Sequence, residues 1–460
     1  MTTNSSSAEI AVEQLPFVLP AEPVRFVTAA SLFDGHDASI NIMRRIMQAN
    51  GAEVIHLGHN RSVDEIVTAA VQEDVQGIAI SSYQGGHIEY FKYLVDKLAA
   101  LGFGHIKIFG GGGGTIVPSE IAELEAYGVT KLFSPQDGQR FGLVGMIQWM
   151  VTEASKVEKN LHAEDVEGLL GGDTRSLARV ITAAEDGRLS DAQRSEVIAA
   201  AAKSGAPVLG ITGTGGSGKS SLTDELLRRF RIDQEDKLRI AVIAVDPTRR
   251  RSGGALLGDR IRMNAIDSSS VYFRSLATRA STEEIPAALD IAIASCKAAG
   301  FDLIIVETPG IGQGDAGIVG HVDVPIYVMT PEFGAASQLE KIDMLDFAEI
   351  VVINKFERRG AEDALRDVRR QIARNREAFT TPIEDLPVFG TIAARFNDDG
   401  VTAMYHHVRN LLVSKGLRVS EGVLPKVSVR SSTVSAQIVP PRDARMEGAM
   451  IFVGWAAFLT

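Results

Sequence analysis

The amino-acid sequence predicts an α/β protein, with a flavodoxin-like doubly wound parallel sheet at 22–152 and a P-loop α/β domain at 206–417. Three observations support this prediction. In the first region, five short apolar runs alternate with segments that have helical spacing. At the start of the second region, a glycine-rich loop joins an apolar run to a helix. Between the two regions, residues 153–205 are charged and alanine-rich, which predicts a helical linker.

Composition limits the class of protein and its compartment. The net charge of −11 argues against broad binding of nucleic acid. The only cysteine, Cys296, excludes an intrachain disulfide framework and is typical of a reducing cytoplasm. Residues 1–21 show no signal peptide and are expected to be disordered, and no apolar run reaches membrane-spanning length. We therefore expect a cytoplasmic protein that binds neither nucleic acid nor membrane.

The first region contains five predicted strand–helix repeats. Continuous apolar runs predict parallel strands that are buried on both faces. Strands are expected at 24–30, 53–57, 77–81, 106–109 and 131–133, and helices at 40–49, 63–71, 88–100, 118–127 and 141–151. Unusual loops follow three of these strands, at 34–39, 81–87 and 110–114. All three lie at the carboxyl ends of strands, the edge at which open α/β sheets bind ligands.

These loops carry two features that suggest a large ligand and a metal. The five consecutive glycines from Gly110 to Gly114 remove side chains, so that something large and flat can approach the backbone. His36 lies two positions from Asp34, whose carboxylate can hold the second ring nitrogen of a metal-ligating histidine. The alternative for His36 is an exposed loop histidine without a ligand.

The second region opens with Gly213-Thr214-Gly215-Gly216-Ser217-Gly218-Lys219-Ser220, which fits G-x-x-x-x-G-K-[ST]. A predicted strand at 207–212 precedes it and a predicted helix at 221–230 follows. In this context backbone amides and the helix N-terminus cradle phosphates. Lys219 reaches the β- and γ-phosphates and the Ser220 hydroxyl can ligate Mg²⁺. The alternative is a glycine-rich turn with a chance Lys-Ser.

Two later strand ends carry acids that suit a magnesium site. A predicted strand at 238–245 ends in Asp246, and one at 301–306 ends in Glu307. Carboxylates at these positions belong near Mg²⁺ or its waters. Together with Lys219 they are the predicted catalytic residues of nucleotide hydrolysis.

Two segments are candidates for conformational signalling. Residues 249–258 are basic and glycine-rich, which is typical of a mobile switch loop that responds to the γ-phosphate. The alternative for its three arginines, 249–251, is a solvated surface run. The helices of the linker are either a passive connection or transmit the nucleotide state to the first region.

A base-recognition motif follows further strands, at 324–329 and 350–353. The second of these ends in Asn354-Lys355-Phe356-Glu357. In GTPases the equivalent Asn-Lys-x-Asp reads guanine, because its acid accepts hydrogen bonds from groups that adenine lacks. Glu357 keeps the acceptor on a side chain that is one methylene longer, so guanine is favoured. Residues 391–394 are a weaker candidate for the last loop that contacts the base.

The three loops of the first region resemble the cobalamin-binding domain of coenzyme-B12-dependent mutases, whose motif is Asp-x-His-x-x-Gly, Ser-x-Leu and Gly-Gly. Here Ser39 replaces the usual Gly and Tyr83 the common Leu. The resemblance implies that His36 is the lower cobalt ligand. It implies cofactor binding by Asp34, His36, Ser39, Ser81, Tyr83, Gly110, Gly111 and Gly112.

The second region resembles the metallochaperone branch of P-loop GTPases that serve B12 mutases. This resemblance implies phosphate binding by Gly216, Ser217, Gly218, Lys219, Ser220 and Ser221, nucleotide contact by Arg262, and base binding by Asn354, Lys355, Phe356 and Glu357. For Mg²⁺ it implies Ser220, Asp246, Asp259 and Glu307, with the backbones of Val245 and Thr308.

The order of the regions, from about 22 to 440, resembles the fused isobutyryl-CoA mutase family. In that family a (β/α)₈ barrel that binds acyl-CoA follows, whereas residues 418–460 here read as the start of a linker with an atypical tail, as truncation or a frameshift would produce. The resemblance implies adenosylcobalamin, GTP and Mg²⁺ as cofactors, and GTP hydrolysis that gates cofactor loading. Acyl-CoA rearrangement would need a supplied barrel.

Two other functions stay open, together with the chain's partners. One is a stand-alone GTPase chaperone that delivers or edits B12 for a separate mutase such as methylmalonyl-CoA mutase. The other is a corrinoid carrier with a regulatory nucleotidase. Expected partners are a second copy of the chain or a mutase.

Overall fold

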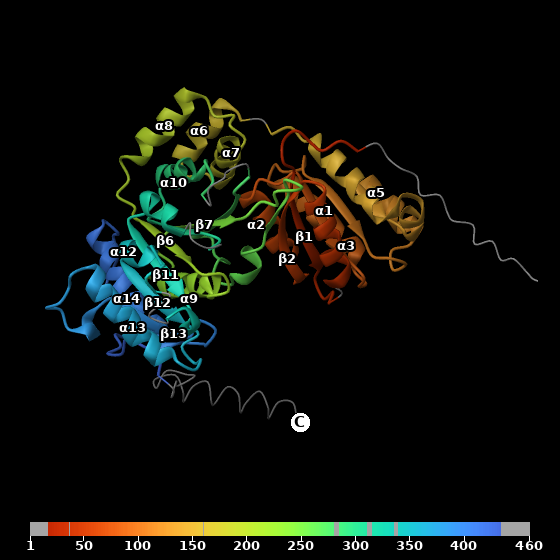
Figure 1. The fold of residues 1–460 in the computed structure, drawn as a ribbon. Helices are drawn as coiled ribbons and strands as arrows, with labels where there is room; N and C mark the ends of the chain where they lie inside the picture. The colour runs from red at the N-terminus through yellow and green to blue at the C-terminus, as the bar shows by residue number, and fades with distance from the viewer. Residues whose placement is uncertain are drawn as a thin grey trace, which may run out of the picture. The chain divides into compact units, whose positions relative to one another are not determined.

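The chain forms two units in the computed structural model, and each unit draws on separated parts of the sequence (Figure 1). The first unit comprises residues 1–206 and 239–309, and the second comprises residues 207–238 and 310–460. The structure describes residues 17–35, 37–159, 161–279, 285–310, 315–334 and 339–433. Residues 434–460 of the predicted linker start and tail (418–460), His36 and most of the predicted disordered N-terminus lie outside the described residues.

The first unit is built on a parallel sheet with the strand order β5-β4-β3-β1-β2-β8. The strands are β1 (Arg25–Ser31), β2 (Glu53–Arg61), β3 (Gly77–Ser81), β4 (Lys107–Gly111), β5 (Lys131–Phe133) and β8 (Ala255–Leu257). The accompanying helices are α1 (Asp37–Ala49), α2 (Val63–Gln72), α3 (His87–Ala100), α4 (Pro118–Tyr127) and α5 (Pro135–Ser155). Strands β2-β1-β3-β4-β5 have the flavodoxin order, which confirms the predicted fold class.

Side chains from alternate positions of this sheet fill a core on each of its faces. Val27 and Ile78 pack with α2, α3 and α4 on one face. Phe26, Val54 and Phe109 pack with α1 and α5 on the other. Neighbouring residues Phe26 and Val27 therefore point in opposite directions, as the pleat requires. Burial on both faces explains why these strands read as continuous apolar runs.

Three further strands of the first unit, β10-β7-β9, pair in parallel. They are β7 (Ile240–Asp246), β9 (Val271–Ala277) and β10 (Leu303–Glu307), with a 3₁₀ turn η1 (Arg260–Arg262) and helix α10 (Leu289–Ala298). The predicted helical linker contains α6 (Ala163–Leu170), α7 (Thr174–Glu185) and α8 (Asp191–Ala201). Helix α7 packs against α2, a helix of the first sheet, and against α10, which precedes β10.

The second unit carries the strand order β13-β12-β11-β6, also parallel. Its strands are β6 (Val208–Gly213), β11 (Val324–Met329), β12 (Ile350–Asn354) and β13 (Val388–Thr391). Its helices include α9 (Lys219–Asp233), α12 (Met344–Phe347), α13 (Ala361–Asn375) and α14 (Asp399–Ser414), with 3₁₀ turns η2 (Asp315–His321), η3 (Pro331–Phe333) and η4 (Ile383–Asp385). Tyr327, Val351 and Val368 belong to its apolar core.

The segment predicted as a switch loop, 249–258, differs in structure from the prediction. Its last residues form β8, which pairs in parallel with β2 in the register Glu53↔Ala255 and Ile55↔Leu257. This strand was not predicted, because it is three residues long and its partner β2 lies about two hundred residues away in the sequence. The domain boundaries drawn from the sequence stay predictions.

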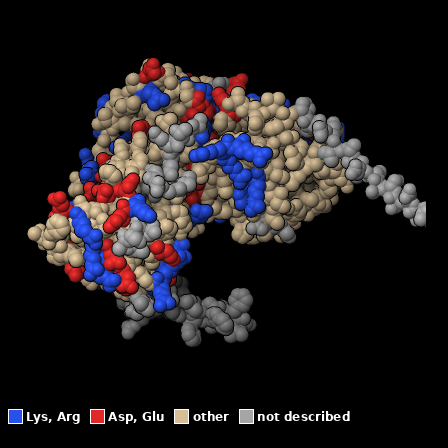
Figure 2. All heavy atoms as spheres, in the orientation of Figure 1, with Lys and Arg blue, Asp and Glu red and all other residues tan. Residues whose placement is uncertain are grey.

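Acidic and basic side chains are interspersed on the left of the view in Figure 2, and Lys and Arg gather in a patch near its centre. Arg249, Arg250 and Arg251 are all exposed, as in a solvated surface run. Partial burial, together with the charges of Arg45 and Arg249, lowers the pKa of Arg44, so α1 and this run lie close together. No helix within the described ranges is long and apolar enough to cross a membrane.

Candidate functional site

The three predicted ligand loops of the first sheet meet at the carboxyl ends of β1, β3 and β4. The buried Asp34 carboxylate accepts a hydrogen bond from the Tyr83 amide at 2.7 Å. Ser31 Oγ donates to Ser82 Oγ at 2.9 Å, and the Ser82 amide donates to the Gly111 carbonyl at 2.9 Å. These bonds join all three loops at one edge of the sheet, where the prediction placed them.

The two departures from the family motif contact each other. Ser39 Oγ, on α1, lies 3.0 Å from the Tyr83 hydroxyl in a hydrogen bond. The Tyr83 ring lies over Gly113, where an added Cβ would stand 3.0 Å from a ring carbon. Gly113 also has φ +59°, a conformation that favours glycine. Ser39 therefore bonds the hydroxyl that Tyr83 brings in place of Leu, and Gly113 leaves room for its ring.

A cavity of about 210 Å³ lies beside these loops. Ser81, Tyr83, Gly110, Gly111 and Gly113 line it, and its remaining wall is largely apolar. Among the described residues, the buried Ser81 hydroxyl has no hydrogen-bond partner, so it can bond to a ligand without losing a protein contact. An apolar slot with a few placed polar groups suits the nucleotide tail of a cobalamin.

Glycine is required where the backbones approach most closely. A Cβ on Gly112 would stand 1.8 Å from the Ser82 carbonyl oxygen, and one on Gly110 would stand 2.5 Å from the Phe91 ring. Gly114, in contrast, has open space around it. The run of five glycines therefore combines two positions fixed by packing with one that is free.

The apolar wall of the cavity was not predicted from the sequence. Phe109 on β4 and Met146, Ile147 and Met150 on α5 contribute to it. Helix α5 is interrupted at Gly142, which has φ 65° and ψ 167°, so its second part follows a new direction along the sheet. The helical spacing of these apolar residues was a signal that could have identified the wall.

His36 lies outside the described residues, so its role as the lower cobalt ligand stays a prediction. Its predicted neighbour Asp34 is fully buried and bonded to the Tyr83 amide. Helix α1 begins directly after His36, at Asp37.

The phosphate loop lies in the second unit, between β6 and α9. The buried Lys219 ammonium donates to the carbonyls of Gly213 at 3.0 Å and Thr214 at 3.2 Å, so its positive charge lies inside the loop. Gly218 has φ 88° immediately before α9, and a Cβ on Gly213 would stand 1.9 Å from the Val328 carbonyl oxygen. This is the strand–loop–helix context that the motif predicted.

Among the described residues, two hydroxyls of the phosphate loop have no hydrogen-bond partner. Thr214 Oγ1 and Ser217 Oγ are buried and have no hydrogen-bond partner within the part of the chain that the structure describes. Buried polar groups without partners are costly, and an oxyanion would satisfy them. The loop therefore fits a phosphate group. Ser220, the predicted Mg²⁺ ligand, is buried at the first turn of α9.

The predicted base-binding motif is tied to the phosphate loop within the second unit. The buried Asn354 amide donates to the Ser217 carbonyl at 2.8 Å, and its oxygen accepts from the Ala393 amide at 3.0 Å. Lys355 Nζ donates to the Gly216 carbonyl at 2.7 Å. Asn354 thus joins the phosphate loop to the 391–394 loop. Its connections suit a residue that orients both loops around one nucleotide.

The other two residues of the motif differ in exposure. Phe356 is buried against Gly390, where an added Cβ would stand 2.5 Å from the ring. Glu357 is exposed, as a side chain that meets a diffusing base must be.

The predicted magnesium carboxylates lie in the first unit. Burial, and then the negative charges of Asp259 and Glu307, raise the pKa of Asp246, so these acids lie close enough to repel one another. A divalent cation would relieve that repulsion. Val245 ends the buried part of β7, and Thr308 is buried after β10.

These carboxylates do not form a complete metal cage. Within the described ranges, no group of three or more His, Cys, Asp or Glu side chains is gathered to hold a metal ion. Mg²⁺ usually takes one or two carboxylates together with waters and substrate phosphates, so two or three nearby acids suffice. Arg262, the predicted nucleotide contact, is largely exposed and pairs with Asp259 at 3.2 Å.

Family comparisons agree with both sites. The sequence model of the B12 binding domain matches residues 24–135, over the sheet that holds the cavity. A second model, of the methylmalonyl-CoA mutase-associated GTPase MeaB, matches residues 177–417. Fold and site therefore define a protein that joins a B12-binding domain to a P-loop GTPase domain. The chain belongs to the MeaB family of methylmalonyl-CoA mutase-associated GTPases.

Similar proteins include fused mutases. Over 426 residues the chain is 65% identical to the fused isobutyryl-CoA mutase of Nocardia farcinica, and the alignment covers 93% of this chain and 40% of that protein. It is 62% identical to the fused isobutyryl-CoA mutase of Cupriavidus metallidurans, with 93% and 39% covered. The predicted resemblance is confirmed. The chain spans about 40% of the length of these relatives.

A likeness to a solved structure is weaker. The LAO/AO transport system kinase matches with a TM-score of 0.38 and 23% identity, over 55% of this chain and 76% of that chain.

Proposed function

We propose that the chain is the cobalamin-binding and GTP-hydrolysing portion of an adenosylcobalamin-dependent acyl-CoA mutase, in which GTP hydrolysis gates cofactor loading. The observation that carries this proposal is the apolar cavity at the ends of β3 and β4, with the unpartnered Ser81 hydroxyl in its wall. The same chain carries a phosphate loop with two unpartnered hydroxyls. Isobutyryl-CoA and n-butyryl-CoA are the proposed substrates of the whole enzyme.

Residues of the cavity bind and position the cofactor tail. Gly110 and Gly111 let the tail lie against backbone, and Phe109 and Met150 exclude water from it. Ser81 donates or accepts one hydrogen bond in the slot. We propose that His36 would ligate the cobalt, and that Asp34, which accepts a hydrogen bond from the Tyr83 amide, would brace its loop. When bound, adenosylcobalamin supplies radical chemistry through homolysis of its cobalt–carbon bond.

Residues of the second site bind and orient the nucleotide. Lys219 and the amides of the phosphate loop neutralise the phosphates, and Ser220 ligates Mg²⁺. Asp246 and Glu307 would hold Mg²⁺ or its waters, and the bound ion would supply positive charge for the phosphates. Asn354 and Glu357 select the base.

A cobalamin titration tests the first site. Base-off binding of adenosylcobalamin should appear in the absorbance spectrum of the unmutated chain and vanish in His36→Ala, while GTP hydrolysis continues. His59→Ala is the matched control, because His59 is exposed on the same sheet. An unchanged spectrum in His36→Ala would overturn the axial-ligand assignment.

Nucleotide selectivity tests the second site. Lys219→Ala should abolish GTP hydrolysis and keep the cobalamin spectrum. Glu357→Ala should reduce discrimination against ATP, whereas Glu362→Ala, an exposed acid in the first turn of α13, should not. Equal turnover of GTP and ATP by the unmutated chain would refute guanine selection.

The second candidate function is a GTPase chaperone that delivers or edits B12 for a separate mutase. Membership in a family of mutase-associated GTPases favours it. An assay with isobutyryl-CoA and a separately produced barrel distinguishes the two. Turnover supports the mutase portion, and transfer of bound cobalamin to methylmalonyl-CoA mutase without such turnover supports the chaperone.

A further inference from the structure

A short segment connects a predicted magnesium carboxylate to the cobalamin sheet. We call Thr248–Gly258 the bridging segment. Its end, β8, is the sixth strand of that sheet, and the amide of Gly258 donates to Asp246 Oδ2 at 3.0 Å. A carboxylate at the predicted metal site is therefore one hydrogen bond away from a strand that pairs with β2.

The bridging segment also contacts the C-terminal end of α1. Ser252 Oγ donates to the Gln48 carbonyl at 2.8 Å. Gly254 lies so close that an added Cβ would stand 2.3 Å from the same carbonyl oxygen. Ile40 and Met43, earlier on α1, line the cobalamin cavity. A displacement of the segment would thus move a helix that forms part of the cavity wall.

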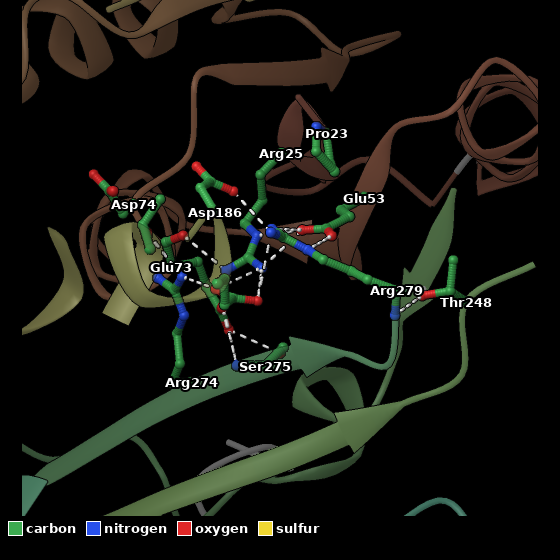
Figure 3. A network of polar contacts seen from close by, with 12 residues as sticks. Pro23, Arg25, Glu53, Glu73, Asp74, Asp186, Thr248, Arg274, Ser275 and Arg279 are labelled. Atoms are coloured by element: carbon green, nitrogen blue, oxygen red, sulfur yellow. Dashed lines mark hydrogen bonds and ion pairs between the residues drawn. The ribbon is translucent and has the colours of Figure 1, made fainter. Parts of the chain in front are cut away.

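Arg279 connects the start of the segment to the sheet, because its backbone amide bonds to Thr248 and its guanidinium makes an ionic contact with Glu53. The Arg279 amide donates to Thr248 Oγ1 at 2.7 Å, and the Thr248 amide donates to Thr278 Oγ1 at 3.0 Å. The Arg279 guanidinium donates to Glu53 on β2 at 2.8 Å and to Asp186 after α7 at 2.7 Å (Figure 3). Residue 279 thereby joins the segment, the cobalamin sheet and the linker.

The ionic contact belongs to a larger buried network. Arg25 on β1 donates to Glu53 at 2.7 Å and to Glu185 on α7 at 2.9 Å. The Ser275 hydroxyl on β9 donates to Glu73 at 2.9 Å (Figure 3). Satisfied networks of this kind are geometrically demanding, because any displaced charge would be left buried without its partner. The elements that share the network therefore move together.

We propose that the bridging segment, held by Arg279, transmits occupancy of the predicted magnesium site at Asp246 to the cobalamin cavity. With Mg²⁺ and GTP bound, the Asp246 carboxylate would change its bond to the Gly258 amide, and β8 would shift with the end of α1. The nucleotide then alters cobalamin affinity, and cobalamin alters nucleotide affinity by the same factor. The inference rests on the proposed gating function and names its route.

The test measures a coupling factor, the ratio of cobalamin dissociation constants without and with a non-hydrolysable GTP analogue and Mg²⁺. Spectral titration with adenosylcobalamin gives both constants. Coupled sites typically show factors of about 5 to 150. Arg279→Ala and Ser252→Ala should each bring the factor at least fivefold closer to one, and cobalamin affinity without nucleotide should stay within about twofold of the unmutated chain.

The two variants are chosen so that folding is preserved. After Arg279→Ala, Glu53 still pairs with Arg25, and Asp186 still pairs with Lys159 and Arg188. Ser252→Ala removes the half-buried hydroxyl that donates to the Gln48 carbonyl and accepts from the Gly254 amide, and it provides an independent measurement. Arg188→Ala is the matched control, because it removes another guanidinium from Asp186 and leaves the bridging segment untouched.

Each result decides the inference. Retained coupling in both variants would refute transmission through the bridging segment but would leave the proposed control of cobalamin binding by GTP intact. A loss of cobalamin affinity without nucleotide would show that Arg279 only supports the sheet, and that result also overturns the route. A factor of one in the unmutated chain would overturn the gate itself and the route with it. Loss of coupling in both variants, with Arg188→Ala unchanged, supports the proposal.

Discussion

Substitution of Gly112 by alanine should damage the cobalamin cavity through one backbone contact. The added Cβ would stand 1.8 Å from the Ser82 carbonyl oxygen, and that atom cannot rotate away as the end of a side chain could. Carbon–oxygen contacts are about 3.3 Å or longer, so the ends of β3 and β4 must separate by roughly 1.5 Å. That movement would break the hydrogen bond from the Ser82 amide to the Gly111 carbonyl.

The expected cost combines overpacking with the lost bond. Overpacking costs about 1–3 kcal/mol, and backbone on both sides places this case near the upper value. A loss of about 3 kcal/mol lowers the thermal midpoint of a unit of this size by roughly 6–12 °C. Because Gly111 and Gly113 line the cavity, cobalamin affinity should fall at least about tenfold, or 1.4 kcal/mol.

Calorimetry and a cobalamin spectral titration measure both effects. Gly114→Ala is the matched control, since its added Cβ meets no atom within 4 Å. This control should keep the thermal midpoint and the affinity of the unmutated chain. Normal cobalamin binding by a folded Gly112→Ala variant would refute the argument that this close approach shapes the cavity.

Three further predictions concern charge and stability. Asp246→Asn should raise the thermal midpoint at pH 7 without Mg²⁺, because the raised pKa of this acid makes its ionised form costly above pH 3.8. The substitution should also remove stabilisation by Mg²⁺. An unchanged midpoint without Mg²⁺ would contradict the prediction. Tyr405→Phe should lower the free energy of unfolding by about 1.5–3 kcal/mol in urea, because its hydroxyl donates to buried Asp233 at 2.6 Å; a loss below about 0.5 kcal/mol would contradict it. Burial opposes ionisation of Glu53, but its arginine neighbours lower its pKa from 4.5 to about 2. The stabilisation that ionised Glu53 provides should therefore be complete above pH 4.5 and lost as pH falls toward 2. Glu53→Gln should flatten the dependence of the thermal midpoint on pH in that window.

Much of the fold could be predicted because it depends on local pattern. The strands at 77–81, 131–133 and 324–329 have the same bounds as the apolar runs that predicted them. The phosphate loop was also predictable, since its residue types and flanking elements are consecutive in sequence. Asn354 could be identified for the same reason, although its bonds to Ser217 and Ala393 could not.

The features that escaped prediction depend on distant partners. Strand β9 contains Arg274, which reads as polar but is fully buried, because Glu185 and Thr182 on α7 accept its hydrogen bonds. Strand β8 is too short to show a period, and its partner β2 is remote in sequence. The cavity wall combines β4 with α5, whose direction changes at Gly142. A single sequence shows neither the compensation of a buried charge nor the pairing of distant strands.

The late position of β8 has a consequence for synthesis. The other five strands of its sheet lie within the first 133 residues, but Ala255 pairs opposite Glu53. At translation rates of roughly 5–20 residues per second, the outer edge of β2 is exposed for about 10–40 s before its neighbour emerges from the ribosome. An open strand edge can pair with another chain during that interval. Aggregation on nascent chains should therefore be most acute while residues 134–254 are being made.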